Sequence, residues 1–184
     1  MGRRTRRVVL LLVVVAVVAA PLLFVLRAKP QLDDSLDAIG KQWAPLRVEL
    51  VERYDTLDAA TGAASDAGLD DALVGELRSA LDDWSRSDQG DDPTVGVPIA
   101  NNLEGLGARL ATVGTANPRL AADEALGFSL TLYTDRAPDP EVVSAYSTAV
   151  DDYERERSSV LKRPLTGFFG FQARDDFVPS IRTS

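Results

Sequence analysis

Between Val8 and Leu26 the chain has 19 consecutive uncharged residues, most of them aliphatic. As a helix rising about 1.5 Å per residue, this run would be roughly 28 Å long, close to the bilayer's hydrocarbon thickness of about 30 Å. A helix that is apolar on every side needs apolar surroundings on every side. We therefore expect residues 8–26 to form a transmembrane helix whose partner is the lipid bilayer.

A cleaved signal peptide is the alternative for this segment, because four arginines precede it in residues 1–7. The apolar run is longer than a usual signal core of about 7–15 residues. Its small-residue site Val18-Ala19-Ala20 is followed by Pro21, which we expect to hinder cleavage. We expect a retained anchor, in which Pro21 can produce a kink because proline has no backbone N–H.

The charges divide the chain into a cationic end and an anionic body. Residues 1–30 hold six basic groups and no acid, whereas residues 31–184 hold 14 basic and 28 acidic groups. Four of the basic groups precede the apolar run, and only Arg27 and Lys29 follow it closely. The positive-inside rule therefore predicts a cytoplasmic N-terminus and an extracytoplasmic body at the inner cell membrane. The expected divisions are a tail (1–7), the span (8–26), a linker (27–31) and the body (32–184).

The composition excludes several kinds of chemistry. The chain has no His and no Cys, so it has no imidazole base, no thiol nucleophile, no disulfide and no zinc site of the usual ligands. An anionic body is also poorly suited to nucleic acid, whose phosphates are neutralised by Lys and Arg. We expect no catalytic, cofactor or metal site and no nucleic-acid partner.

The body shows the apolar periodicity of helices. Steps of three and four predict one seam of Leu32, Leu36, Ile39, Trp43, Leu46, Leu50, Tyr54 and Leu57; a second of Leu69, Leu73, Leu77, Leu81 and Trp84; and a third of Ile99, Leu103, Leu106, Leu110 and Val113. Two further helices are expected after Asn117-Pro118 and Asp139-Pro140, which read as a capping residue followed by proline. The last of them carries Val143, Tyr146, Val150, Tyr153 and Val160.

The predicted fold is all-α: an antiparallel bundle of long helices behind one N-terminal transmembrane helix. Expected breaks are residues 61–68, 85–97, 114–117 and 134–139. Pro45 is either a kink or the first turn of a new helix. The third and fourth helices are either antiparallel neighbours or one interrupted helix. Seams with near-heptad steps also allow coiled-coil pairing between copies.

Several stretches of the body resemble the LemA family. These are Tyr146-Ser-Thr-Ala-Val150-Asp-Asp-Tyr153, the aromatic-glycine motif Arg163-Pro164-Leu-Thr-Gly-Phe-Phe-Gly-Phe171, the first helix with Trp43, Leu50 and Arg53-Tyr54-Asp55, and Asn117-Pro118-Arg-Leu120 with Glu124. The likeness covers about residues 43–177. The chain departs from the family at Ser147 and Glu154, where asparagine is usual, and at Thr56-Leu57-Asp58-Ala59. The resemblance implies a divergent, membrane-anchored helical bundle and no particular enzymatic activity or functional residue.

Acidic residues offer two candidate sites. The cluster Asp82, Asp83, Asp88, Asp91 and Asp92 could bind Ca²⁺, but its spacing fails the EF-hand pattern and a solvated loop is expected. The pairs Asp70-Asp71, Asp151-Asp152 and Asp175-Asp176 could suggest acid–base catalysis. Adjacent helical residues point about 100° apart, however, so we expect no catalytic pair there.

Aromatic residues offer the remaining candidates. For Arg53-Tyr54-Asp55, Tyr146 and Tyr153 we expect core and polar rim with bonded hydroxyls, the alternative being a ligand pocket. Phe168, Phe169 and Phe171, with Gly167 and Gly170, form either a capping turn on the helix ends or an interaction patch for a protein or the lipid interface.

Two function classes follow from these features. The first is a non-enzymatic envelope protein that binds protein partners, with either another protein or a second copy of itself as the partner. The alternative is a ligand-sensing or carboxylate-based enzymatic domain on a membrane anchor.

Overall fold

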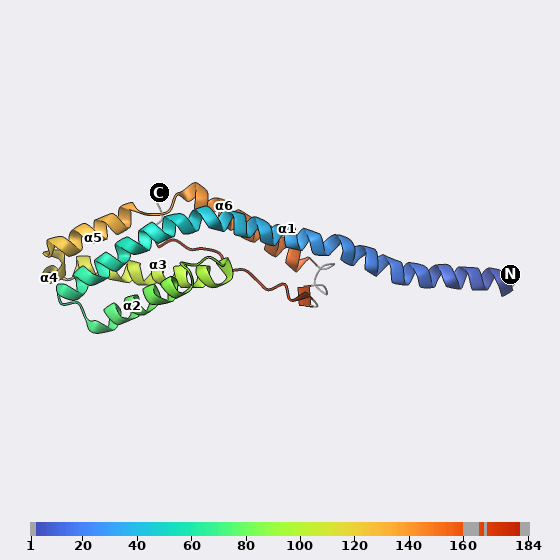
Figure 1. Ribbon diagram of the computed structural model, residues 1–184, viewed down its shortest axis with the longest axis horizontal. Coiled ribbons are helices and arrows are strands. Elements are labelled where there is room, and N and C mark those ends of the chain that lie inside the picture. Colours follow the sequence, from blue (N-terminus) through green and yellow to red (C-terminus); the bar gives the residue numbers. More distant parts are fainter. Residues whose placement is uncertain (1–2, 160–165, 168, 181–184) are drawn as a thin grey trace. The chain divides into compact units, whose positions relative to one another are not determined.

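The computed structural model describes residues 3–159, 166, 167 and 169–180, with backbone alone for residues 3–26. Within these residues there are six helices and no strand: α1 (Arg3–Asp66), α2 (Asp71–Arg86), α3 (Pro93–Ala116), α4 (Pro118–Ala121), α5 (Glu124–Asp135) and α6 (Pro140–Ser158). They pack as an all-α bundle, as predicted (Figure 1). Two compact units divide the chain: the first comprises residues 1–37 and 152–173, and the second residues 38–151 and 174–184.

Where side chains are described, no helix has a stretch both long and apolar enough to cross a membrane. The predicted membrane helix between Val8 and Leu26 lies outside those residues, because only its backbone, within α1, is described.

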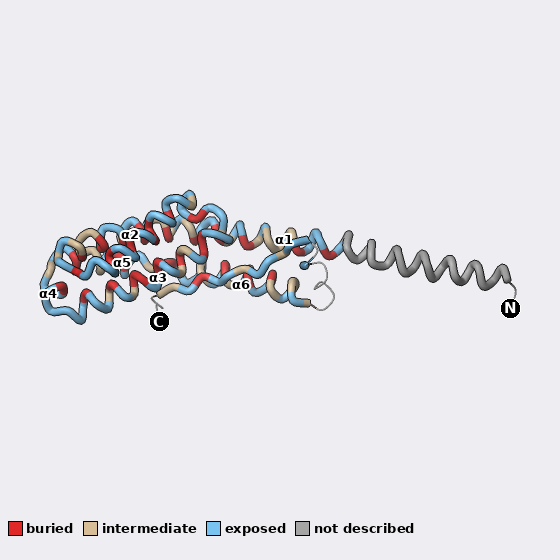
Figure 2. Tube along the Cα trace, turned by 90° about the horizontal axis from the view of Figure 1, so that it is seen from below, coloured by how far each residue is buried: buried red, intermediate tan, exposed pale blue. Residues whose placement is uncertain are grey.

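The core of the second unit follows the predicted seams. Trp43, Leu46, Leu50, Tyr54 and Leu57 of α1 are buried, and so are Leu73, Leu77, Leu81 and Trp84 of α2. The buried residues recur along the inner sides of α2, α3 and α5 (Figure 2). Aromatic rings join the helices: Tyr54 meets Trp84 edge-on at 5.0 Å between centroids, and Trp43 lies 5.4 Å from Tyr146 of α6. Apolar burial of this kind is the main stabilising contribution in the bundle.

Three predicted boundaries are wrong. Helix α1 continues through Pro45, without a new start, and through most of the expected break to Asp66, where Ala60 and Ala64 are buried. The loop expected over residues 85–97 is shorter, because Asp92 caps α3 and Pro93 occupies its first turn. The helix expected after Asn117 is divided into α4 and α5, because the Asp123 side chain accepts the Leu126 N–H and caps a new helix.

The loop between α2 and α3 is fixed by α1. Asp88, Gln89 and Gly90 have positive φ values of 52°, 55° and 72°, so the chain turns sharply there. The Trp43 indole N–H donates to the Gly90 carbonyl at 2.7 Å, and Arg47 donates to the Asp88 carbonyl at 3.1 Å. Side chains from α1 therefore satisfy the backbone groups that this turn leaves unpaired.

Helices α3 and α5 approach closely at two glycines. A Cβ on Gly107 would lie 2.3 Å from the Tyr133 hydroxyl oxygen, and one on Gly114 would lie 2.9 Å from a Leu130 methyl carbon. At the end of α3 the buried position is therefore Gly114. Val113, which was predicted to be in the seam, is 36% exposed. Of the two arrangements predicted for this pair of helices, the structure has neighbouring helices, joined through α4.

Candidate functional site

The second unit contains a fully buried ion pair between α1 and α3. Arg53 and Glu104 have side chains 0% and 1% exposed, and the Arg53 Nε and Glu104 Oε1 atoms are 2.7 Å apart. A second bond joins Arg53 Nη2 to Glu104 Oε2 at 3.0 Å, so the guanidinium grips both carboxylate oxygens. A pair like this is strongly held only when the remaining donors and acceptors are also satisfied.

The side of the Arg53 guanidinium that does not face Glu104 contacts helix α5. Arg53 Nη1 donates to the Tyr133 carbonyl at 2.6 Å, and the guanidinium carbon lies 3.9 Å from the centroid of the Tyr133 ring. Tyr133 belongs to the last turn of α5, whose carbonyls have no partner within their own helix. A cation is also favourable at the negative end of the helix dipole. Arg53 therefore joins α1, α3 and α5 at one point.

The C-terminal segment closes the other side of the ion pair. Ser180 donates its backbone N–H to Glu104 Oε2 at 2.9 Å and its hydroxyl to the same oxygen at 2.6 Å. We refer to residues 174–180 as the C-terminal strap. Together, Arg53, Glu104, Tyr133 and Ser180 form a buried polar cluster contributed by four separate parts of the sequence.

The pKa values of Arg53, Tyr54 and Tyr133 move away from neutrality. Burial alone would lower the pKa of Arg53, but the hydrogen bonds and charge of Glu104 outweigh it and raise that pKa. Burial, reinforced by the Glu104 charge, raises the pKa of Tyr54 well above its ordinary value and that of Tyr133 to about 12. Acid–base catalysis favours a pKa near the working pH. The pKa values of Arg53, Tyr54 and Tyr133 are instead shifted further from the working pH, which fits a structural role.

The Tyr133 hydroxyl is buried and forms no hydrogen bond with the described residues, although Arg53 and Ser180 lie close enough to lower its pKa. Replacing Tyr133 by phenylalanine is expected to keep or raise the free energy of unfolding, by up to about 1–3 kcal/mol, because an unpaired buried polar group is penalised. Chemical denaturation followed by tryptophan fluorescence measures this. A loss of stability would contradict it and show that the hydroxyl is paired.

The sequence indicated Arg53 but missed its partners. Arg53-Tyr54-Asp55 was expected to form core and polar rim; Arg53 and Tyr54 are buried, and Asp55 is exposed. Glu104 was not singled out, although it is the only charged residue between Pro93 and Ala108 and lies on one helical stripe with Ala100 and Gly107. That lone charge on a buried stripe was the available signal.

The expected hydrogen bonding of the tyrosines is confirmed. Tyr54 donates to the Ala100 carbonyl at 3.1 Å, Tyr146 to Asp175 at 3.1 Å and, in the first unit, Tyr153 to Gln172 at 2.7 Å. Two of the three acceptors lie in the C-terminal segment rather than in a helix.

Three of the five acidic candidates have separate structural partners. Asp83 pairs with Arg86, Asp91 pairs with Arg47, and Asp92 caps α3. The Thr94 N–H lowers the pKa of Asp92, and the charge of Arg174 adds to that effect. Within the described part of the chain, no three acidic side chains are placed to hold a metal ion.

The paired acids are also spread over different roles. Asp70 caps α2 by accepting the Ala72 N–H at 3.2 Å, Asp152 pairs with Arg155, and Asp176 accepts from Ser147. A hollow of about 470 Å³ does gather Glu49, Glu52, Asp135 and Asp139. There Glu52 pairs with Arg136, and Glu49 accepts the Asp139 N–H at 2.8 Å.

Part of the predicted aromatic patch is visible in the first unit. Phe169 is 37% exposed, its ring lies 6.5 Å from that of Phe171, and the Lys29 ammonium lies 6.0 Å from it. Gly170 has a φ of 73°, which explains the need for glycine in this turn. Phe168 and Val160 lie outside the described residues.

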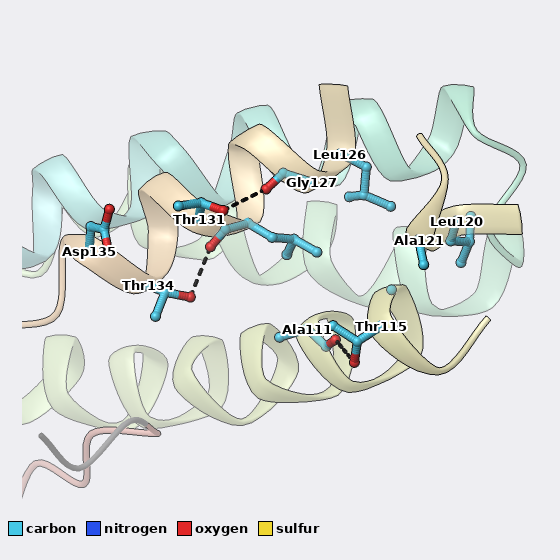
Figure 3. A pocket seen from close by; sticks show the side chains of 11 residues that line it. Ala111, Thr115, Leu120, Ala121, Leu126, Gly127, Thr131, Thr134 and Asp135 are labelled. Atoms are coloured by element: carbon cyan, nitrogen blue, oxygen red, sulfur yellow. Dashed lines mark hydrogen bonds between the residues drawn. The ribbon is translucent and has the colours of Figure 1, made fainter. Parts of the chain in front are cut away.

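The sequence did not single out the most exposed apolar surface. On α5, Phe128 is 66% exposed and Leu132, one turn later, is 37% exposed. The same helix also borders a groove of about 330 Å³, which runs between α3 and α5 and ends at α4, and which is lined by other residues of α5 than Phe128 and Leu132 (Figure 3). The hydroxyls of Thr115, Thr131 and Thr134 in this groove donate to carbonyls of their own helices, so their oxygens and Asp135 are the polar side-chain groups of a lining that is otherwise apolar.

No protein-family model matches the chain, and searches of curated proteins and of solved structures also found no match.

Proposed function

We propose that the chain is a LemA-like, single-pass membrane protein whose helical body binds another protein and has no enzymatic activity. The observation that carries the proposal is the exposed apolar side of α5, formed by Phe128 and Leu132 one turn apart. Exposed large apolar side chains that lie side by side are typical of interaction sites.

The charge distribution supports a docking role for this helix. Between Glu124 and Asp135, α5 has ten residues without a charge, in a body with a net charge of −14. Depletion of charge at the centre of a contact surface and charge around its rim are the usual pattern of protein interfaces. We call the surface formed by Phe128 and Leu132 the α5 face.

The membrane attachment rests on the sequence. The apolar run between Val8 and Leu26 supports a retained anchor, and its flanking arginines support a cytoplasmic N-terminus with an extracytoplasmic body. Phe168, Phe169 and Phe171 remain a second proposed contact, for a partner or for the lipid interface. Protection of the body from protease in right-side-out vesicles would contradict the proposed orientation.

The alternative, a ligand-sensing or carboxylate-based enzyme, has less support. Its best location is the hollow around Glu49 and Glu52, where the acidic side chains are engaged with Arg136 and a backbone N–H. A carboxylate that acts as acid or base needs a displaced pKa and access to a substrate.

Replacing both Phe128 and Leu132 by serine is expected to abolish crosslinking of the body to its partner in membranes. The free energy of unfolding should fall by no more than about 2 kcal/mol, because Phe128 is 66% exposed and Leu132 loses only the contacts of a side chain that is 37% exposed. Crosslinking and co-purification from solubilised membranes, with thermal melting alongside, measure the two effects.

Val95→Ser is the matched control, since Val95 is 49% exposed in the first turn of α3, far along that helix from its contacts with α5 at Gly107 and Gly114. This control variant should crosslink like wild type. Unchanged crosslinking in the Phe128/Leu132 variant, or recovery of the wild-type protein always alone, would refute a docking role for the α5 face.

A further inference from the structure

The C-terminal strap lies as extended chain against the helices of the second unit, to which it belongs. It has no helix or strand, and side chains of the helices pair with its backbone. The Asn101 amide donates to the Asp176 carbonyl at 2.8 Å and accepts the Val178 N–H at 2.8 Å. One amide side chain thus pairs with two backbone groups of extended chain, in the way that a neighbouring strand would.

Side-chain contacts along the strap add sequence preference to this backbone pairing. Phe177 is 2% exposed and supplies an apolar anchor. Ser147 donates to the Asp176 carboxylate at 2.8 Å, and Ser180 donates twice to Glu104. At the other end Arg174 donates to the Thr94 hydroxyl, close to the Asp92 carboxylate. The order recognised is therefore a cation, an acid, an aromatic anchor and a hydroxyl.

We infer that the surface beneath the strap is a binding groove for extended peptide and that the strap of a second copy of this chain can occupy it. Every contact described above is made by residues 174–180, so a strap from another copy would supply the same bonds. The segment from the end of α6 at Ser158 to Arg174 leaves 15 residues as a connection. A chain of 15 residues spans at most about 50 Å, which sets the distance over which a strap can be exchanged between copies.

The covalent connection favours binding of the chain's own strap over binding of the strap of a second copy. Because strap and groove belong to one chain, binding within that chain has the advantage of an effective concentration, so exchange is suppressed in dilute wild-type protein. That advantage is removed when two variants are mixed, one with a weakened groove and the other with a weakened strap, because neither chain then binds its own strap well. Exchange of a terminal element between identical chains then needs no new interface.

The test uses two full-length variants in detergent. The groove variant, Asn101→Ala with Ser147→Ala, keeps an intact strap, and the strap variant, Phe177→Ala, keeps an intact groove. A mixture of the two can form one wild-type contact between chains that neither can form within itself. We expect the mixture to associate at least tenfold more tightly than either variant with itself, measured by energy transfer between labelled chains.

Association of the mixture that is no tighter than self-association of either variant would overturn the proposal. A chain carrying all three substitutions is the matched control and should not associate with the strap variant. Circular dichroism and melting establish that each variant is folded. The α5 face is unchanged in all of them, so this outcome is independent of the proposed function.

A synthetic peptide of residues 172–184 provides a second arm that needs no pairing of chains. It should bind the full-length strap variant at least tenfold more tightly than a scrambled peptide does, and adding the groove substitutions should remove the difference. Equal binding of both peptides would overturn the groove. Specific peptide binding without association of the chains would overturn the second copy as its occupant.

Discussion

The Glu104→Ala variant is expected to lose about 3–5 kcal/mol of unfolding free energy, because it leaves the Arg53 guanidinium buried without its counter-charge. Arg53 is fully buried, and two of its bonds go to the Glu104 carboxylate. The substitution also leaves Ser180 without an acceptor, so release of the C-terminal strap should accompany the loss. Chemical denaturation gives the free energy, and increased proteolysis near residue 180 reports the strap.

A double variant separates the penalty of an unpaired charge from the value of the pair. Arg53→Met with Glu104→Leu should recover most of the loss, since a buried pair replaced by apolar groups of similar volume is often neutral. The surface pair Glu76–Arg109 is the control: its side chains are 51% and 59% exposed, and Glu76→Ala should cost no more than about 1 kcal/mol. Equal losses from Glu104→Ala and Glu76→Ala would contradict the importance given to burial.

The Gly96→Ala variant is expected to lose about 1–3 kcal/mol, because the added methyl group has no room. Its Cβ would lie 2.7 Å from the Gly90 carbonyl oxygen, 2.8 Å from the Gly90 Cα and 2.9 Å from Trp43 Cζ2. Backbone cannot move aside as a flexible side chain does, so the turn at Gly90 must shift and its hydrogen bond from Trp43 must lengthen. Denaturation measures the loss, and a change in tryptophan fluorescence reports the shift.

Gly105→Ala is the matched control on the same helix. A Cβ there meets nothing within 4 Å, and Gly105 is exposed. Alanine should therefore stabilise α3 by about 0.5–1 kcal/mol through its higher helix propensity. A Gly96→Ala variant as stable as Gly105→Ala would show that the turn at Gly90 yields at no cost.

Much of the bundle follows from local sequence. Leucine and aromatic residues at steps of three and four predicted the buried sides of α1 and α2, because a helix that packs on one side repeats its apolar positions with its own period. Asn117 and Asp139 were recognised as caps, and each accepts a backbone N–H two residues later. Asp92 and Asp123 cap helices in the same way but were interpreted as loop and helix interior. Isolated aspartates fit turns and caps equally well.

The site could be predicted only in part. Arg53 drew attention through its neighbours, but Glu104 is 51 positions away, and Ser180 is 76 positions beyond Glu104. The exposed side of α5 was missed because its apolar residues surround the helix, so periodicity does not distinguish Leu126, which is buried, from Phe128, which is not.

The sequence by itself determined the anchor prediction, the all-α class and the residues that form most of the core, because these depend on composition and on spacing along one helix. Only the tertiary structure decided that Arg53 meets Glu104, that Gly107 and Gly114 admit α5, and that the C-terminal strap closes the cluster. Periodicity reports which side of a helix is buried. The partner that a buried charge or a glycine meets depends on how helices far apart in the sequence pack together.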